Sequence, residues 1–136
     1  MPGENLELAR RLCEAARSGP PEETVERVVG LAHPRVEFVS RLSEVQGGRY
    51  VGHEGVQAYF IDMADAWEEW RASVVDLEEL APDTVLAELS THAVAKGGFE
   101  GDLPSFLLVT IEDGKVRRVV SHASREEALE TAGISN

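Results

Sequence analysis

The sequence contains a single cysteine, Cys13, among its 136 residues. One thiol cannot form an internal disulfide, and it cannot build a metal site that needs several cysteines. Cys13 shares a helical spacing with Leu6, Ala9 and Ala16. We therefore expect a small, buried, apolar residue at this position rather than a nucleophile.

Long apolar runs and basic residues are also scarce. No run approaches the ~20 apolar residues that a transmembrane helix needs. The first residues lack a basic stretch followed by an apolar core, so we predict no signal peptide and expect a cytoplasmic protein. Lys and Arg number 13 against 25 Asp and Glu, which gives a formal net charge of -12. Nucleic acids and anionic membranes bind through Lys and Arg, so neither is an expected partner.

Common cofactor motifs are missing as well. The sequence has no G-x-G-x-x-G loop and no Walker motif, which argues against the usual nucleotide-binding folds. Its four histidines show no metal-ligand spacing, so we predict no metal and no other cofactor. His33 precedes a proline and is expected to face solvent, whereas His53 lies at a helix start and is expected to be structural.

Length and composition fit one globular domain over residues 1–136, with 43% hydrophobic and 28% charged residues. The patterns indicate three helices with a small hairpin among them, then a four-stranded meander and a terminal helix. This order favours an α+β fold with a curved antiparallel sheet. The predicted helices are 4–17, a short one after Pro21, 54–70 and one after Ser124, and the predicted strands are 35–42, 49–51, 71–80, 84–96, 104–111 and 116–122.

Two local patterns fix expectations for particular side chains. The helix over 54–70 carries an apolar stripe that includes Trp67 and Trp70, so this face should be buried. Asp113-Gly114 is typical of a two-residue hairpin turn. With a regular register from that turn, Leu108 should pair with Val119 and Phe106 with Ser121.

Four segments taken together resemble the SnoaL-like family, which belongs to the nuclear-transport-factor-like and ketosteroid-isomerase-like cone folds. The resemblance covers about residues 5–134 and depends on the order and spacing of the pieces. These are Tyr50-Val51-Gly52-His53-Glu54-Gly55-Val56, Trp67-Glu68-Glu69-Trp70, Asp113-Gly114-Lys115-Val116 and Arg125-Glu126-Glu127-Ala128-Leu129-Glu130-Thr131-Ala132-Gly133-Ile134.

The resemblance implies a bent sheet that forms a cone, closed by helices, with a pocket inside. SnoaL-like cyclases carry a general acid/base on the last strand, and Ser121 stands at that place here. A hydroxyl does not replace a carboxylate without its own base. Catalysis is therefore expected only if His92 or His122 faces the pocket. The expected pocket residues are Tyr59, Met63, Trp67, Phe106, Leu108 and Ser121.

Two functions remain open from the sequence. The first is a domain that binds a small apolar molecule, with or without cofactor-free cyclase, isomerase or hydrolase chemistry. The second is a non-catalytic dimeric scaffold or interaction domain with a residual cavity. Apolar residues occur on both faces of the later strands, such as Val109 and Ile111 against Leu108. Since the helices can bury only one of the two apolar faces, the other needs a second cover. We therefore predict a homodimer that buries more than about 1,000 Å² of surface.

Overall fold

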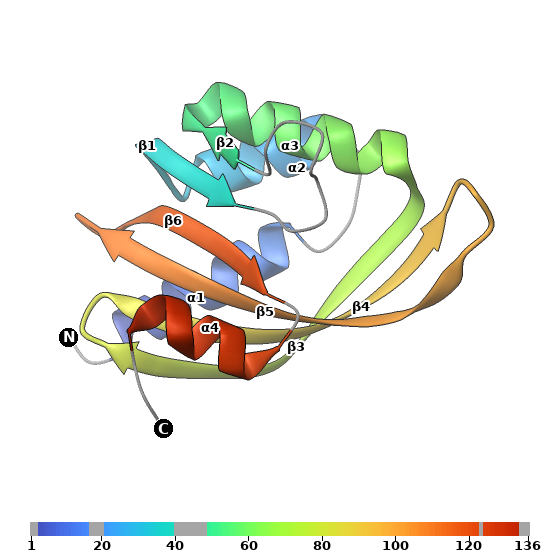
Figure 1. Cartoon of the computed structure of the whole chain (residues 1–136). Helices are drawn as coiled ribbons and strands as arrows, with labels where there is room; N and C mark the ends of the chain where they lie inside the picture. The colour runs from blue at the N-terminus through green and yellow to red at the C-terminus, as the bar shows by residue number, and fades with distance from the viewer. Residues whose placement is uncertain (1–2, 17–20, 40–48, 123, 134–136) are drawn as a thin grey trace.

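The computed structural model describes residues 3–16, 21–39, 49–122 and 124–133. These ranges hold helices and strands in an α+β arrangement, as predicted (Figure 1). The helices are α1 (Glu4–Ala15), α2 (Pro21–Val29), α3 (Gly52–Ala66) and α4 (Arg125–Ala132). The strands are β1 (Ala32–Val39), β2 (Arg49–Val51), β3 (Trp67–Ala81), β4 (Thr84–Ala95), β5 (Glu100–Glu112) and β6 (Lys115–His122).

The strands form one open sheet in the order β2-β1-β6-β5-β4-β3. The prediction of a wholly antiparallel sheet was wrong, because β1 runs parallel to its neighbour β6. Hairpin-connected strands must be antiparallel, but β1 is separated from β6 in the chain by α3 and four strands, β2 to β5. The remaining neighbours are antiparallel.

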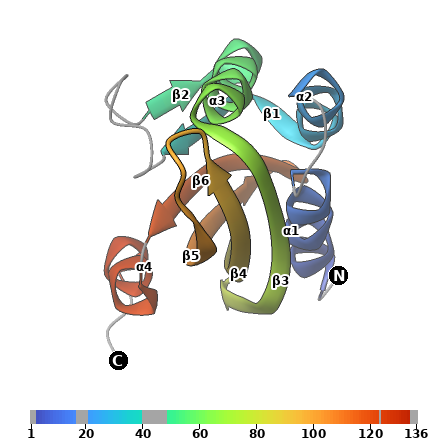
Figure 2. The same cartoon turned by 90° about the vertical axis from the view of Figure 1, so that its right-hand side faces the viewer.

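Helices lie on both faces of the curved sheet. In Figure 2, α1 and α4 flank opposite sides of β3–β6. We call the α1 side the inner face and the α4 side the outer face. α2 packs against α3, and α3 covers β1 and β2. None of the helices that the structure describes has the length and apolar character of a membrane-spanning segment.

The main core lies between the inner face and the helices α1, α2 and α3. β-branched side chains fill it, as expected for residues that pack on a pleated surface. The largest fully buried side chains of this core are Val28, Val36, Val56, Val85, Val109 and Val116. A second group on the outer face, Leu86, Leu108 and Val120, is also buried on the side where α4 packs.

Local capping signals place α4 as predicted. The Ser124 side chain accepts a hydrogen bond from the Glu127 backbone N–H at 3.2 Å, which satisfies one free donor of the first turn. Gly133 ends the helix with a φ of 76°, a left-handed conformation that favours glycine. Ala128 and Leu129 are buried toward the sheet.

α3 ends earlier than predicted, at Ala66, so both tryptophans lie on β3 rather than on the helix. In the sheet, Trp67 is opposite Ala95 and Trp70 is opposite Ala93. The spacing of the two tryptophans fits a helix, but pairing with β4 overrides this local preference. Trp67 is partly exposed and contacts Phe99 edge-on at a centroid distance of 6.4 Å.

The β5–β6 hairpin contains the most consequential departure from the prediction. Asp113 and Gly114 form the expected turn, with φ of 54° and 72°. One extra residue, Arg117, then forms a bulge. Beyond it, the pairs become Leu108 with Val120 and Phe106 with His122. The predicted partners Val119 and Ser121 were therefore wrong by one residue.

Candidate functional site

A cavity of about 120 Å³ lies between the inner face of the sheet and the helices α1 and α3. Its walls come from elements that are far apart in the sequence, which the curvature of β3–β5 brings together (Figure 1). The lining residues are Leu12, Cys13, Ala16, Phe38, Val39, Tyr59, Phe60, Met63, Trp67, Trp70, Ala72, Leu89, Thr91, Ala93, Leu103, Ser105, Leu107, Val119 and Ser121.

The structure places four of the six expected pocket residues on this lining: Tyr59, Met63, Trp67 and Ser121. It places Phe106 and Leu108 on the outer face instead. Successive residues of a strand point to opposite faces, and Ser105 and Leu107 are the β5 residues that reach the cavity. The bulge at Arg117 explains both outcomes, because it aligns Ser121 with Leu107 rather than with Phe106.

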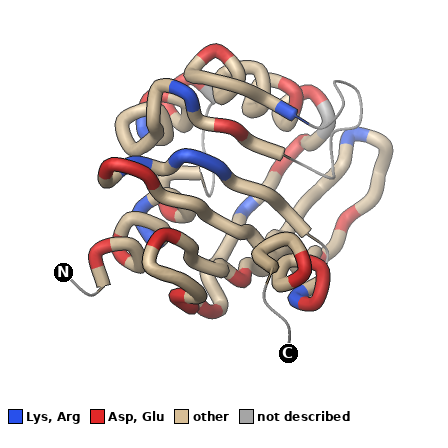
Figure 3. Tube along the Cα trace, turned by 60° about the vertical axis from the view of Figure 1, so that its left-hand side comes forward, with Lys and Arg blue, Asp and Glu red and all other residues tan. Residues whose placement is uncertain are grey.

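The cavity wall is almost entirely apolar. Aromatic rings form one part of it, and Tyr59 contacts both Phe38 and Tyr50 edge-on at centroid distances of 5.4 Å. Thr91, Ser105 and Ser121 contribute hydroxyls from three neighbouring strands. Among the described lining residues there is no Asp, Glu, Lys, Arg or His. Figure 3 shows the acidic residues spread over the helices, turns and strand ends of the surface.

Cys13 reaches the cavity from α1 and is 4% exposed. Burial, with a smaller effect from Glu14, raises the pKa of its thiol to about 12. A thiolate is the nucleophilic form of cysteine, so this side chain stays protonated near neutral pH. The expectation of a small buried residue agrees with this position.

His92, one of the two candidate catalytic residues, lies on the outer face of β4 and outside the cavity lining. Its Nδ1 is 2.9 Å from Asp102 Oδ1 and its Nε2 is 3.2 Å from Glu100 Oε2. The hydrogen bond to Asp102 is the main reason that the pKa of His92 is raised above its ordinary value. Two carboxylates therefore favour the doubly protonated ring at the surface.

His122, the other candidate, also lies away from the cavity. It is opposite Phe106 at the end of β6, and its neighbour Ser121 takes the inward position. The His122 side chain is 12% exposed, with Nδ1 4.0 Å from Glu127 Oε2 at the start of α4. The sequence left open whether His122 faces the pocket. The bulge is present, but it leaves Ser121 inside.

A tyrosine–carboxylate pair adjoins the aromatic wall. The Tyr50 hydroxyl donates a hydrogen bond to Asp62 Oδ2 at 2.7 Å, which ties β2 to α3. Tyr50 is 3% exposed, and neither residue is part of the cavity lining. The pair positions the rings of Tyr50 and Tyr59 rather than offering a group to a ligand.

A second hollow lies between α2 and α3, on the far side of α3 from the sheet. It has a volume of about 470 Å³ and is more open to solvent than the cavity. Its lining is Glu22, Val25, Gln57, Ile61, Ala64 and Asp65. This surface depression has no converging hydroxyls or aromatic rings.

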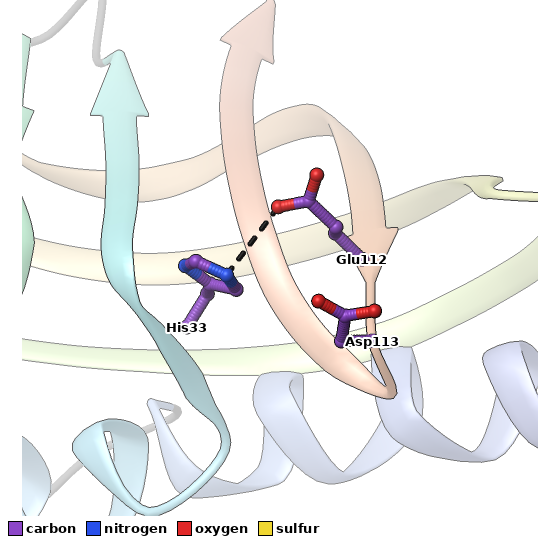
Figure 4. A group of neighbouring side chains, drawn as sticks. All are labelled: His33, Glu112 and Asp113. Atoms are coloured by element: carbon purple, nitrogen blue, oxygen red, sulfur yellow. Dashed lines mark ion pairs between the residues drawn. The ribbon is translucent and has the colours of Figure 1, made fainter.

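Three side chains with metal-ligating atoms meet where β1 passes the β5–β6 turn, namely His33, Glu112 and Asp113 (Figure 4). His33 is distant in the sequence from the adjacent pair Glu112 and Asp113, and no spacing motif signals their approach. His33 Nδ1 accepts a hydrogen bond from the Arg35 backbone N–H at 3.0 Å, so Nε2 carries the proton of the neutral ring.

Nε2 of His33 lies 3.3 Å from Glu112 Oε2, and Arg117 Nε approaches the same oxygen at 3.5 Å. A metal ion would have to displace the proton and compete with the guanidinium. The geometry fits an ion-pair network better than a metal centre. His53 is also in a structural position, with Nε2 3.3 Å from the Ala32 carbonyl oxygen.

A family model described as the SnoaL-like domain matches residues 9–119. The chain belongs to this family. The match includes α1 to α3 and most of the sheet, so the cavity of this SnoaL-like domain is built largely from family elements. No curated protein sequence matches the chain.

Solved structures share the fold of this SnoaL-like domain over nearly the whole chain. An NTF2-like protein of unknown function from Burkholderia pseudomallei K96243 has 18% identity and a TM-score of 0.76, covering 93% of this chain and 95% of its own. TerC, co-crystallised with polyporic acid, has 20% identity and a TM-score of 0.75, with coverages of 93% and 96%.

A third protein, RV0760c from Mycobacterium tuberculosis, was solved in complex with estradiol-17β-hemisuccinate. It has 15% identity and a TM-score of 0.69, and the match covers 90% of this chain and 95% of that one. At these identities the likeness establishes the fold, and function has to be argued from the site.

Proposed function

We propose that this SnoaL-like domain binds a small, neutral, largely apolar molecule in the cavity between α1, α3 and the inner face. The observation that carries the proposal is the composition of the lining. Aromatic and aliphatic side chains dominate it, three serine and threonine hydroxyls interrupt it, and no described lining residue is charged. Ligand pockets commonly combine an apolar wall with a few polar groups that orient the ligand.

The cavity volume limits the size of the ligand. An engineered protein cavity of about 150 Å³ binds benzene. A space of about 120 Å³ therefore suits a molecule near the size of one ring, without rearrangement of the walls. A polycyclic ligand would need the walls to move apart. TerC and RV0760c, which were solved with polyporic acid and with estradiol-17β-hemisuccinate, support a binding role for the shared fold.

Proton-transfer catalysis is not part of the proposal. A general acid or base must come within about 2.6–3.2 Å of the reacting group, directly or through one water. His92 and His122 are on the outer face, and the raised pKa of Cys13 keeps its thiol protonated. No described residue of the cavity lining is a histidine or a carboxylate.

Binding can be tested with toluene as an apolar probe. The chain has two tryptophans, Trp67 and Trp70, and both line the cavity. Toluene should therefore produce a saturable change in tryptophan fluorescence. Ala93→Leu extends a side chain from a lining position that is 2% exposed and should weaken this binding at least tenfold by filling the space.

Ser90→Leu is the matched control, because Ser90 belongs to the same strand but points to the outer face. It should leave toluene binding unchanged. Thermal melting followed by far-UV circular dichroism checks that both variants fold. The absence of saturable binding by the wild-type protein would contradict the proposal and favour the scaffold function.

A further inference from the structure

We infer that the ligand carries one neutral oxygen, a hydroxyl or carbonyl, which hydrogen-bonds to a member of a row of three hydroxyls on the inner face. The row consists of Thr91 on β4, Ser105 on β5 and Ser121 on β6. This inference rests on the proposed binding function and adds the chemical class of the ligand: a single-ring phenol, alcohol or ketone.

The strand register fixes the row. Ser105 is opposite Leu89, and Thr91 is two residues further along β4. Ser121 is opposite Leu107, which is two residues from Ser105 on β5. Each hydroxyl is thus a diagonal neighbour of the next, and diagonal neighbours across antiparallel strands are about 7–8 Å apart. The three groups form a polar diagonal across an apolar floor.

The remaining lining favours a ring beside that diagonal. Tyr59 and Met63 project from α3, while Trp67 and Trp70 stand on β3 at the edge of the sheet. Aromatic edges and faces pack well against another ring. A ring held by these side chains can direct a substituent toward the hydroxyl row. An oxygen substituent would find partners there that an apolar substituent cannot use.

Hydroxyls suit a neutral oxygen better than an ion. Each hydroxyl has one donor and two acceptor lone pairs, so it can serve a carbonyl or a hydroxyl, even when it already makes one hydrogen bond. A carboxylate or ammonium ligand would lose its hydration without gaining a counter-charge from the described lining. The analogue without oxygen should bind more weakly, because it offers no hydrogen-bond partner to the hydroxyl row.

The experiment compares three probes of similar shape: phenol, toluene and benzoate. Isothermal titration calorimetry measures their affinities for the wild type, for Thr91→Val, for Ser105→Ala and for the triple variant with Ser121→Ala. Thr91→Val keeps the shape of the side chain and removes only its hydroxyl. Ser90→Ala is the control, since it removes a hydroxyl from the outer face of the same strand.

The triple variant, and the single variant that removes the hydroxyl in contact with the ligand oxygen, should each lower the affinity for phenol about three- to tenfold, the effect of one net hydrogen bond. The affinity for toluene should stay the same or increase, and Ser90→Ala should change neither. Benzoate should bind at least tenfold more weakly than phenol. Far-UV circular dichroism confirms the fold of each variant.

Two results would overturn the inference and leave the proposed function intact. The first is a triple variant in which the ratio of phenol to toluene affinity equals that of the wild type. The second is benzoate binding as tight as phenol binding. If neither toluene nor phenol binds the wild type, the proposed function itself is wrong and the inference falls with it.

Discussion

Truncation of two adjacent leucines on β5 tests which side chains face the cavity. Leu108 is 5% exposed and belongs to the buried group on the outer face, on the side of α4. Leu107 lines the cavity and is only partly buried. The two residues have the same type, the same strand and neighbouring positions, so each is the control for the other.

The expected costs differ because the surroundings differ. Leu→Ala changes in well-packed cores cost about 2–5 kcal/mol, and the cost grows with the volume of the new cavity. Leu108→Ala opens space between the sheet and α4 and should lower the free energy of unfolding by about 3 kcal/mol. Leu107 already borders empty space and makes fewer contacts on that side. Its truncation should cost about 1–2 kcal/mol.

Urea titration followed by far-UV circular dichroism measures both costs. The same two variants separate stability from binding. Leu107→Ala enlarges the cavity and should admit probes larger than toluene, such as naphthalene, whereas Leu108→Ala should not. A larger loss of stability for Leu107→Ala than for Leu108→Ala would mean that the faces of β5 are exchanged. The Arg117 bulge would then be misplaced as well.

Three further predictions concern other parts of the molecule. The pKa of His92, measured by NMR, should exceed its ordinary value and should fall in Asp102→Asn. Because the pKa is raised in the folded state, the protonated ring should stabilise the fold in acid. This stabilisation should be lost as the pH rises through the folded-state pKa. An unchanged pKa in Asp102→Asn would refute this. Gly55→Ala should lower the free energy of unfolding, measured by urea titration, by about 1–3 kcal/mol, because the alanine Cβ would lie 2.8 Å from the Tyr50 carbonyl carbon. An unchanged free energy would show that α3 shifts easily. The homodimer stays a prediction: light scattering at micromolar concentration should give twice the monomer mass, and a monomer would contradict it.

Short-range signals predicted a large part of the fold. The Asp113-Gly114 turn and the Ser124 cap are determined by a few neighbouring residues, and both occur as expected. The family resemblance is confirmed by the match over residues 9–119. The six strands were found because alternating apolar residues and turn residues delimit them, although their ends differ by a few positions.

Features that depend on tertiary pairing were harder to predict. Trp67 and Trp70 fit the apolar stripe of a helix, and only pairing with β4 shows that they belong to β3. The parallel contact between β1 and β6 joins segments separated by most of the chain. Neither feature has a local sequence signal, so periodicity alone assigned the tryptophans to the helix.

Arg117 connects these pairing effects to the chemistry of the site. The bulge that it forms is supported from a neighbouring strand, because Arg117 Nη1 donates a hydrogen bond to the Arg35 carbonyl oxygen on β1 at 2.7 Å. The parallel partner thus helps to hold the extra residue in β6. Without the bulge, a regular hairpin would align Ser121 with Phe106 and move the β6 side chains relative to those of β5.

With the bulge, Ser121 joins Ser105 and Thr91 on one face, while His122 lies beside Glu127 on the other. The choice between a hydroxyl and an imidazole inside the cavity therefore depends on one residue that never touches the cavity. This dependence on the bulge also explains why a sequence comparison of β6 alone is a poor guide to catalysis in this domain. The inward side chain is set by the register, and the register is set jointly by β1, β5 and the guanidinium of Arg117.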